Sequence, residues 1–137
     1  MKTMNEPQVI SRVVTWLSNE GYRNIKTKTL EEHGVDIIAS KKYGRFVYIE
    51  CKGEPKGSAT HRSSQIEVNF IYAIGQIVTR MSRAYQSYGL AFPKSYHSKL
   101  RRIPWLFAKK NNVFVLLIDK NGSIKKYTWK ELQKIRK

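Results

Sequence analysis

Two short stretches decide the fold of this chain: GVDII at residues 34–38 and YIECK at residues 48–52. Both are rich in β-branched and aromatic residues, which favour strands, and Lys-Tyr-Gly at 42–44 is typical of a hairpin turn. If the two strands are hairpin neighbours, Asp36 lies beside Glu50. Because side chains alternate between the faces of a strand, Glu50 and Lys52 should share one face, with Cys51 on the other.

This arrangement predicts a metal-dependent phosphodiesterase site. Two adjacent carboxylates repel each other unless a cation joins them. Oxygen ligands in a half-open site suit Mg²⁺ or Mn²⁺, which keep several waters and take phosphate oxygens as ligands. Lys52 beside such an ion could hold or deprotonate an attacking water. The alternative interpretation is a surface salt bridge at a strand end, because an acid two positions before a lysine recurs by chance. Residues 54–56 are such a repeat, and their proline excludes a regular strand.

Length and charge narrow the class of protein. The 137 residues suffice for one domain, residues 1–137, and 26 Lys and Arg against 10 Asp and Glu give a net charge of +16. That excess favours a polyanionic partner, nucleic acid first and an anionic membrane surface second. The single cysteine excludes an intrachain disulfide. The chain shows neither an apolar leader segment nor a run long enough for a membrane span, so we expect a cytoplasmic protein.

The flanking sequence predicts a mixed sheet with helices on both faces. Asn5 and Gly21 are typical of the start and end of a first helix, and Ser64 with Glu67 has capping-box spacing for a long second helix. In the first half of the chain we expect a helix at 6–20, strands at 24–30, 35–39 and 45–51, and a mobile loop at 53–63. A helix at 65–86 and a strand at 89–92 should follow, and then a basic aromatic segment at 96–110 that is broken at Pro104. The chain should end with a buried strand at 113–118, an edge strand at 124–128 and a short basic helix.

The long helix should carry one apolar and one polar face. The apolar stripe, expected in the core, is Ile66, Phe70, Ile74, Ile77 and Met81. The polar face is either merely solvated or functional, and it comprises Asn69, Tyr72, Gln76, Arg80 and Arg83. In the functional interpretation Gln76 reaches the site or a substrate phosphate, and Arg80 extends a phosphate track. Gly75 is costly in a helix interior and would be explained by close approach to the sheet.

Basic residues after the third strand suggest contacts to a nucleic-acid backbone. Lys56, His61 and Arg62 lie in the expected loop, where they could position DNA without reading its sequence. The alternative is an ordinary flexible loop.

Several of these segments together resemble a known protein family. Glu6 on the first helix, residues 34–38 and residues 48–52 are similar to the PD-(D/E)XK nuclease superfamily, which has the restriction-endonuclease-like fold. Mrr-type domains and archaeal Holliday-junction resolvases are the nearest in pattern, and Gly75-Gln76 resembles the helix signature of XisH-type excision-control factors. The resemblance implies an α/β fold with an αβββαβ core, a DNA substrate and Mg²⁺ or Mn²⁺. It implies Asp36, Glu50 and the Cys51 carbonyl as metal ligands, Glu6 as a further acid near the metal, and Lys52 as the catalytic lysine.

Two classes of function therefore stay open. The first is a metal-dependent DNA endonuclease with Asp36, Glu50, Lys52 and Gln76 as its catalytic set. The second is a non-catalytic DNA-binding or recombination- and excision-control protein on the same fold. An RNA-directed nuclease would use the same residues. So small a chain has no separate specificity domain, so we expect a homodimer or dependence on a protein partner.

Overall fold

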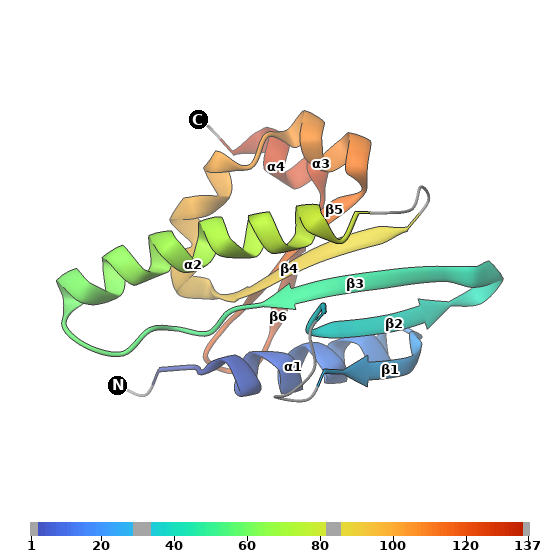
Figure 1. The fold of residues 1–137 in the computed structure, drawn as a ribbon, viewed down its shortest axis with the longest axis horizontal. Helices are drawn as coiled ribbons and strands as arrows, with labels where there is room; N and C mark the ends of the chain where they lie inside the picture. Colours follow the sequence, from blue (N-terminus) through green and yellow to red (C-terminus); the bar gives the residue numbers. More distant parts are fainter. Residues whose placement is uncertain (1–2, 29–33, 82–85, 136–137) are drawn as a thin grey trace.

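The computed structural model describes residues 3–28, 34–81 and 86–135, and these form one mixed six-stranded sheet flanked by helices (Figure 1). The strand order is β1-β2-β3-β4-β5-β6, with β3–β4 and β4–β5 parallel and the other neighbours antiparallel. The predicted α/β class is thus confirmed. The elements are α1 (Glu6–Asn19), β1 (Arg23–Thr27), β2 (Ile37–Lys41), the 3-10 turn η1 (Lys42–Gly44), β3 (Arg45–Cys51), α2 (Ala59–Thr79), β4 (Ser87–Pro93), the 3-10 segment η2 (Lys94–Arg102), α3 (Trp105–Asn111), β5 (Val113–Ile118), β6 (Ile124–Tyr127) and α4 (Trp129–Lys134).

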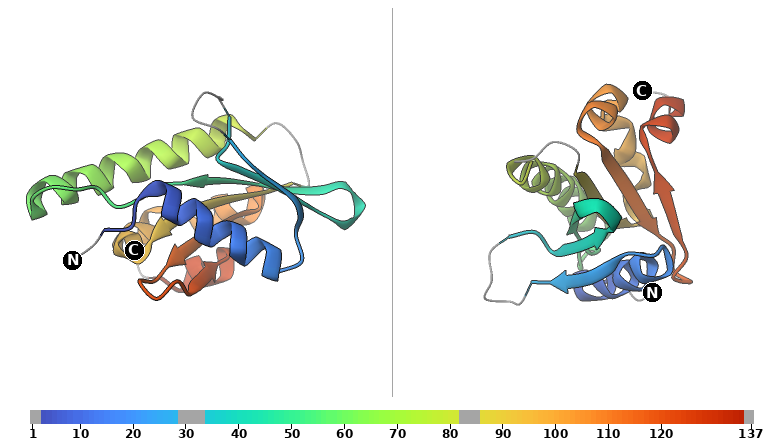
Figure 2. Two further views of the ribbon diagram at one scale, coloured as in Figure 1. Left: turned by 90° about the horizontal axis from the view of Figure 1, so that it is seen from below. Right: turned by 90° about the vertical axis from the view of Figure 1, so that its right-hand side faces the viewer.

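The sheet separates two hydrophobic cores (Figure 2). Helix α1 packs on one face, whereas α2, η2, α3 and α4 cover the other. Strand β5 is buried at every position and sends alternate side chains into each core. On β3, Val47, Ile49 and Cys51 face α1, so Glu50 faces α2 together with Tyr48. The alternation predicted for residues 50 and 51 is therefore confirmed.

The first helix begins and ends where its sequence predicts. Asn5 accepts a hydrogen bond from the backbone N–H of Gln8, whose side chain in turn accepts from the Asn5 N–H. The chain leaves the helix at Gly21, which has a φ of 88°. The cap matters for the site because it fixes Glu6 in the first turn.

The second helix differs from its predicted bounds at both ends. It begins at Ala59, where Ser58 caps the backbone N–H of His61, so the expected loop at 53–63 is helical from residue 59. No helix breaker follows Gly57, which is why the helix extends back past Ser64. Glu67, predicted to belong to a capping box, instead forms ion pairs with Lys99 and Arg102. At the other end the helix stops at Thr79 rather than Gln86.

The explanation expected for Gly75 is wrong. A side-chain carbon added there would meet no atom within 4 Å, so this glycine faces away from the sheet. The close approach occurs at Gly53, directly after β3. A side chain at that position would collide with the backbone of Asn5 and Glu6. Gly53 therefore lets the start of α1 lie against the end of β3.

Candidate functional site

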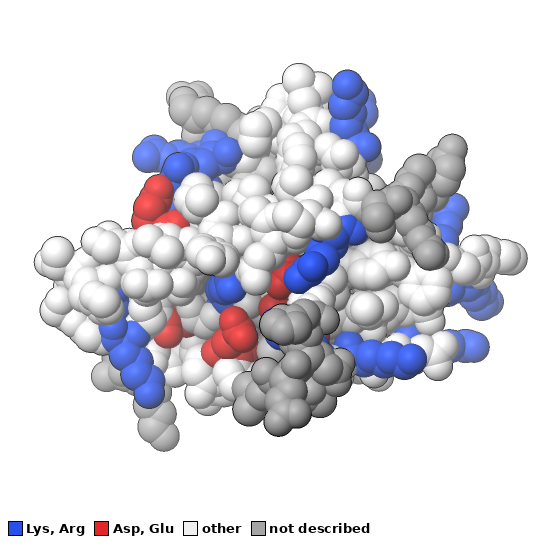
Figure 3. Space-filling view, in the orientation of Figure 1, with Lys and Arg blue, Asp and Glu red and all other residues white. Residues whose placement is uncertain are grey.

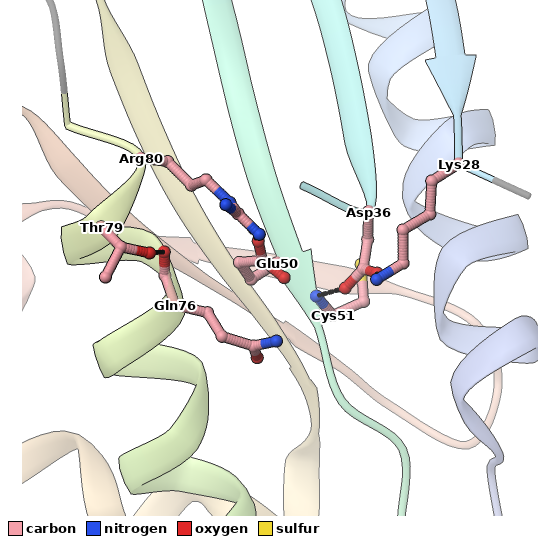
Figure 4. Close-up of polar contacts among 7 residues, drawn as sticks. All are labelled: Lys28, Asp36, Glu50, Cys51, Gln76, Thr79 and Arg80. Atoms are coloured by element: carbon pink, nitrogen blue, oxygen red, sulfur yellow. Dashed lines mark hydrogen bonds and ion pairs between the residues drawn. The ribbon is translucent and has the colours of Figure 1, made fainter. Parts of the chain in front are cut away.

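Asp36 and Glu50 lie opposite each other at one end of the β2–β3 hairpin. The register pairs Ile37 with Ile49, and its next step sets Asp36, directly before β2, against Glu50. The Asp36 carboxylate is held in place because its Oδ2 accepts a hydrogen bond of 2.7 Å from the Cys51 N–H (Figure 4). Both acids are buried, with 2% of Asp36 and none of Glu50 exposed. The hairpin thus places two carboxylates side by side away from bulk water.

The environment of Glu50 disfavours its charged form. Burial, and then the neighbouring Asp36 carboxylate, raise the pKa of Glu50 to about 7. Among the described residues, neither carboxylate oxygen of Glu50 has a hydrogen-bond partner. The guanidinium Nε of Arg80 lies 3.7 Å from Oε1 of Glu50, which is an ion pair too long for a hydrogen bond. The site therefore holds a buried carboxylate with unused ligand capacity.

Lys28 also lies at the candidate site, although it was not among the residues predicted from the sequence. Its Nζ lies 3.1 Å from Oδ1 of Asp36, and this contact raises the pKa of Lys28. This contact could have been predicted from the sequence, since a hairpin between the first two predicted strands brings a residue of the first strand beside Asp36. The Lys28 backbone N–H indeed donates to the Asp36 carbonyl. Lys28 and Arg80 together offset part of the negative charge of the two acids.

Glu6 and Lys52 complete the group. Burial, followed by the Asp36 carboxylate, raises the pKa of Glu6, while Lys52 and Lys28 act to lower it. Glu6 therefore lies within electrostatic range of these three residues, and its role near a metal stays a prediction. The ammonium of Lys52 lies 5.7 Å from the centre of the Tyr72 ring, so Lys52 is on the face of the sheet that α2 covers.

Helix α2 brings more of the predicted residues to this site. The side chain of Gln76 extends toward the sheet beside Arg80 and Glu50 (Figure 4). Its Oε1 is buried and, within the described part of the chain, has no hydrogen-bond partner. Tyr72 is 65% exposed and borders Lys52. Arg83, the last predicted residue of this face, lies outside the described residues.

The ion pairs of Asp36 and Glu50 within the described residues are with Lys28 and Arg80, not with the basic residues near the start of α2. Lys56 and His61 are exposed. Arg62 lines an open pocket of about 420 Å³ together with Glu54, Ser95 and Lys99. The contacts of these basic residues to nucleic acid stay a prediction.

Glu54 has a structural role in this region. Its two carboxylate oxygens accept hydrogen bonds from the Met4 N–H and the Ser95 hydroxyl. It therefore ties the segment after β3 to the N-terminal residues and to η2. This agrees with the rejection of residues 54–56 as a second catalytic motif.

The donor set fits a divalent cation with an incomplete protein shell. Among the residues that the structure describes, no three His, Cys, Asp or Glu side chains are grouped as a metal cage. The Glu50 oxygens accept no hydrogen bond within the described residues, whereas Asp36 Oδ1 would exchange its contact with Lys28 for the ion. This pair suits Mg²⁺, which is commonly bound through one or two carboxylates plus water and phosphate oxygens. The Cys51 thiol is excluded, since it is buried on the opposite face and burial raises its pKa well above the usual value.

Comparison with solved structures finds proteins of the same fold. An FdxN element excision controlling factor protein from Anabaena variabilis superposes with a TM-score of 0.50 at 22% identity, covering 88% of this chain and 97% of that one. An XisH family protein from Nostoc punctiforme PCC 73102 gives 0.46 at 19% identity, covering 88% and 98%. No family model matches the chain. No curated protein matches it either. The Anabaena variabilis structure agrees, at the level of fold alone, with the predicted likeness to excision-control factors.

Within the described residues, no helix is both long enough and apolar enough to cross a lipid bilayer.

Proposed function

We propose that the chain hydrolyses phosphodiester bonds in DNA with the help of a divalent metal ion. The observation that carries this proposal is the pair of buried, opposed carboxylates, Asp36 and Glu50, next to Lys52. A protein that only binds DNA gains nothing from two carboxylates near a phosphate, because both repel it. A hydrolase gains metal ligands from the same pair.

Asp36 and Glu50 would hold the metal, with the Cys51 carbonyl as a third ligand from the same strand end. When bound, Mg²⁺ or Mn²⁺ would polarise the scissile phosphate and neutralise developing charge. Lys28 and Arg80 offset the two acidic charges in the structure described here. Arg80 is the looser of the two partners, at 3.7 Å, and is therefore available to turn toward a substrate phosphate.

The remaining residues would orient the attacking water. Lys52 follows Glu50 on the same face of β3 and would hold the water or take its proton. The unpaired Oε1 of Gln76 is an acceptor that such a water could use. Glu6, anchored by the Asn5 cap, would add a second acceptor from α1. These groups come from the end of β3, from α2 and from α1, and their meeting at one place supports the proposal.

The overall charge supports DNA as the substrate. A net charge of +16 gives strong attraction to a phosphate backbone without sequence selection. Lys56, His61, Arg62, Tyr72 and Arg80 are the described residues that we propose as backbone contacts. RNA presents the same phosphates and is included as a control substrate.

A second function, excision control without cleavage, is favoured by the comparisons. The Anabaena variabilis neighbour is described as an excision controlling factor, and neither neighbour is described as a nuclease. In this alternative the chain binds DNA at a recombination site and acts through other proteins. The comparisons support this alternative more directly than they support hydrolysis, whereas the paired carboxylates support hydrolysis.

Binding and cleavage measured on the same samples separate the two functions. Linear, single-stranded, flapped and four-way-junction DNA, with an RNA control, would be incubated with Mg²⁺, Mn²⁺ or EDTA. Hydrolysis predicts metal-dependent products for wild type and unchanged binding without products for Asp36→Asn. Excision control predicts tight binding by both proteins and no products from either.

A further inference from the structure

The outward face of α2 carries an apolar stripe that no other described residue buries. Val68, Ile71 and Val78 are 49%, 48% and 45% exposed, although the opposite face of the helix is buried in the core. With Ser64 and Gly75 they recur at alternating intervals of four and three residues. This is the spacing of a helix that packs along another helix. We call these five residues the outer stripe.

The outer stripe is unusual for so basic a protein. From Ser63 to Thr79 the only charged residue is Glu67, and its carboxylate is paired with Lys99 and Arg102. In Figure 3 the surface along the middle of α2 is largely white, with few Lys or Arg atoms. Solvent-facing helix positions normally carry the charged residues. Here that face is neutral, although the chain has a net charge of +16.

Gly75 belongs to the same face and is not needed by the fold. The space above it is open, and its φ lies outside the left-handed region in which glycine is favoured. Glycine at such a site weakens the helix relative to alanine. It becomes useful when another helix must come close, because it leaves a hole for the partner's side chain.

We propose that a second copy of this chain packs its α2 antiparallel on this stripe. With the two-fold axis between residues 71 and 72, the stripe matches itself at one pair of positions, since Val68 of one copy meets Gly75 of the other. Ile71 and Ser64 then meet Tyr72 and Thr79, which are uncharged, exposed neighbours of the stripe on α2. A two-fold contact requires such a match between a surface and itself. Two chains of +16 repel each other wherever their basic faces meet, and the neutral stripe is a face on which they can touch.

The two-fold symmetry also determines the direction in which the two candidate sites face, and this point rests on the proposed function. In antiparallel face-to-face packing, the two-fold axis lies in the interface and runs across the helices. Rotation about this axis keeps each flank of α2 on its own side. The flank that carries Gln76 and Arg80 therefore faces the same side in both copies. Both candidate sites would open toward one DNA duplex.

We expect the contact between the two copies to be weak and to become stronger as the salt concentration rises. From Ser64 to Val78 the stripe is about 21 Å long at the helical rise. So small an interface belongs to the transient class, with a Kd of the order of 10–100 μM. Screening reduces the repulsion between the basic chains, so self-association should strengthen with salt.

Sedimentation velocity over a concentration series tests the dimer without reference to cleavage. Wild type should show a monomer–dimer equilibrium that shifts toward dimer as salt rises. Ile71→Lys should weaken dimerisation at least tenfold with an unchanged circular-dichroism melting temperature. The matched control is Leu106→Lys, which changes another exposed apolar residue, 58% exposed on α3, and should dimerise like wild type. A wild type that stays monomeric at all salts, or an Ile71→Lys protein that still dimerises, overturns the proposal.

Cysteine cross-linking tests the orientation. Val68→Cys and Gly75→Cys would be made as separate proteins, mixed and mildly oxidised; the native Cys51 is buried and does not compete. Antiparallel packing predicts that the mixture gives more disulfide dimer than either protein alone. A parallel arrangement predicts efficient cross-linking of each single variant with itself. That result, or no cross-linking at all, contradicts the proposal, whereas a dimer that does not cut DNA would refute only the proposed function.

Discussion

Glu50 is the residue of the candidate site on which the proposed metal binding depends most. It is fully buried beside another acid, and its carboxylate lacks hydrogen bonds within the described residues. An acid in this position is a poor contributor to stability but a good metal ligand. Its cost in stability and its capacity to bind metal can be measured separately.

Replacing Glu50 with glutamine should stabilise the metal-free protein at alkaline pH. The pKa of this group is raised from its ordinary value of 4.5 to about 7 in the folded protein. Its stabilising contribution is therefore full below about pH 4.5 and is lost as pH rises through about 7. In EDTA, Glu50→Gln should exceed wild type in unfolding free energy by about 1–3 kcal/mol at pH 8 and by little at pH 5.

Urea unfolding at both pH values measures this difference. The control is Glu67→Gln, which removes an exposed carboxyl whose pKa is lowered by Lys99 and Arg102. It should not reproduce the gain at pH 8. An equal effect of Glu50→Gln at both pH values would show that the carboxyl is not protonated near neutrality.

Metal binding should stabilise the folded protein in a pH-dependent manner. Since Glu50 must be deprotonated to bind, added Mg²⁺ or Mn²⁺ should raise the melting temperature more at pH 8 than at pH 6. Asp36→Asn should abolish the increase because it removes half of the carboxylate pair. Differential scanning calorimetry with matched ionic strength gives the readout. A metal-induced increase that persists in Asp36→Asn would place the ion elsewhere.

At the scale of the elements, two glycines have opposite roles. Gly53→Ala would drive a methyl group into the backbone of Asn5 and Glu6, so it should destabilise the fold by about 2–4 kcal/mol. Gly75→Ala meets no atom within 4 Å and should stabilise α2 by about 0.5–1 kcal/mol. Denaturant unfolding at low protein concentration, where dimers do not form, measures both. A Gly53→Ala protein as stable as wild type would contradict the close approach of α1 and β3.

The two glycines also illustrate which features of the fold could be predicted from the sequence and which could not. The hairpin, the buried run at 113–118 and the faces of residues 50 and 51 follow from alternation and turn chemistry, which are local. The register of Asp36 against Glu50 followed from the same hairpin. The start of α2 did not, since Ser58 and Ser64 are both competent caps and only the folded chain selects one. Which glycine permits close approach depends on contacts between α1 and β3 that lie far apart in sequence.

For the whole molecule, charge should dominate encounters with DNA. The net charge of +16 implies that several phosphates are neutralised on binding. Affinity should fall by about a thousandfold between about 50 and 200 mM salt. Fluorescence anisotropy with labelled duplex over a salt series measures the slope, and self-association should follow the opposite trend. A flat slope for DNA would remove the electrostatic argument for a nucleic-acid substrate.

We propose that Asp36, Glu50 and Lys52 form a hydrolytic site. A single-turnover cleavage assay on the DNA structure bound most tightly, comparing wild type with Lys52→Met in Mg²⁺, Mn²⁺ and EDTA, tests this site. We expect metal-dependent cleavage by wild type, none in EDTA, and a loss of at least a hundredfold in rate for Lys52→Met with little change in affinity. Cleavage by Lys52→Met at the wild-type rate, or tight binding by wild type with no cleavage under any metal, would show that these residues do not form a hydrolytic site.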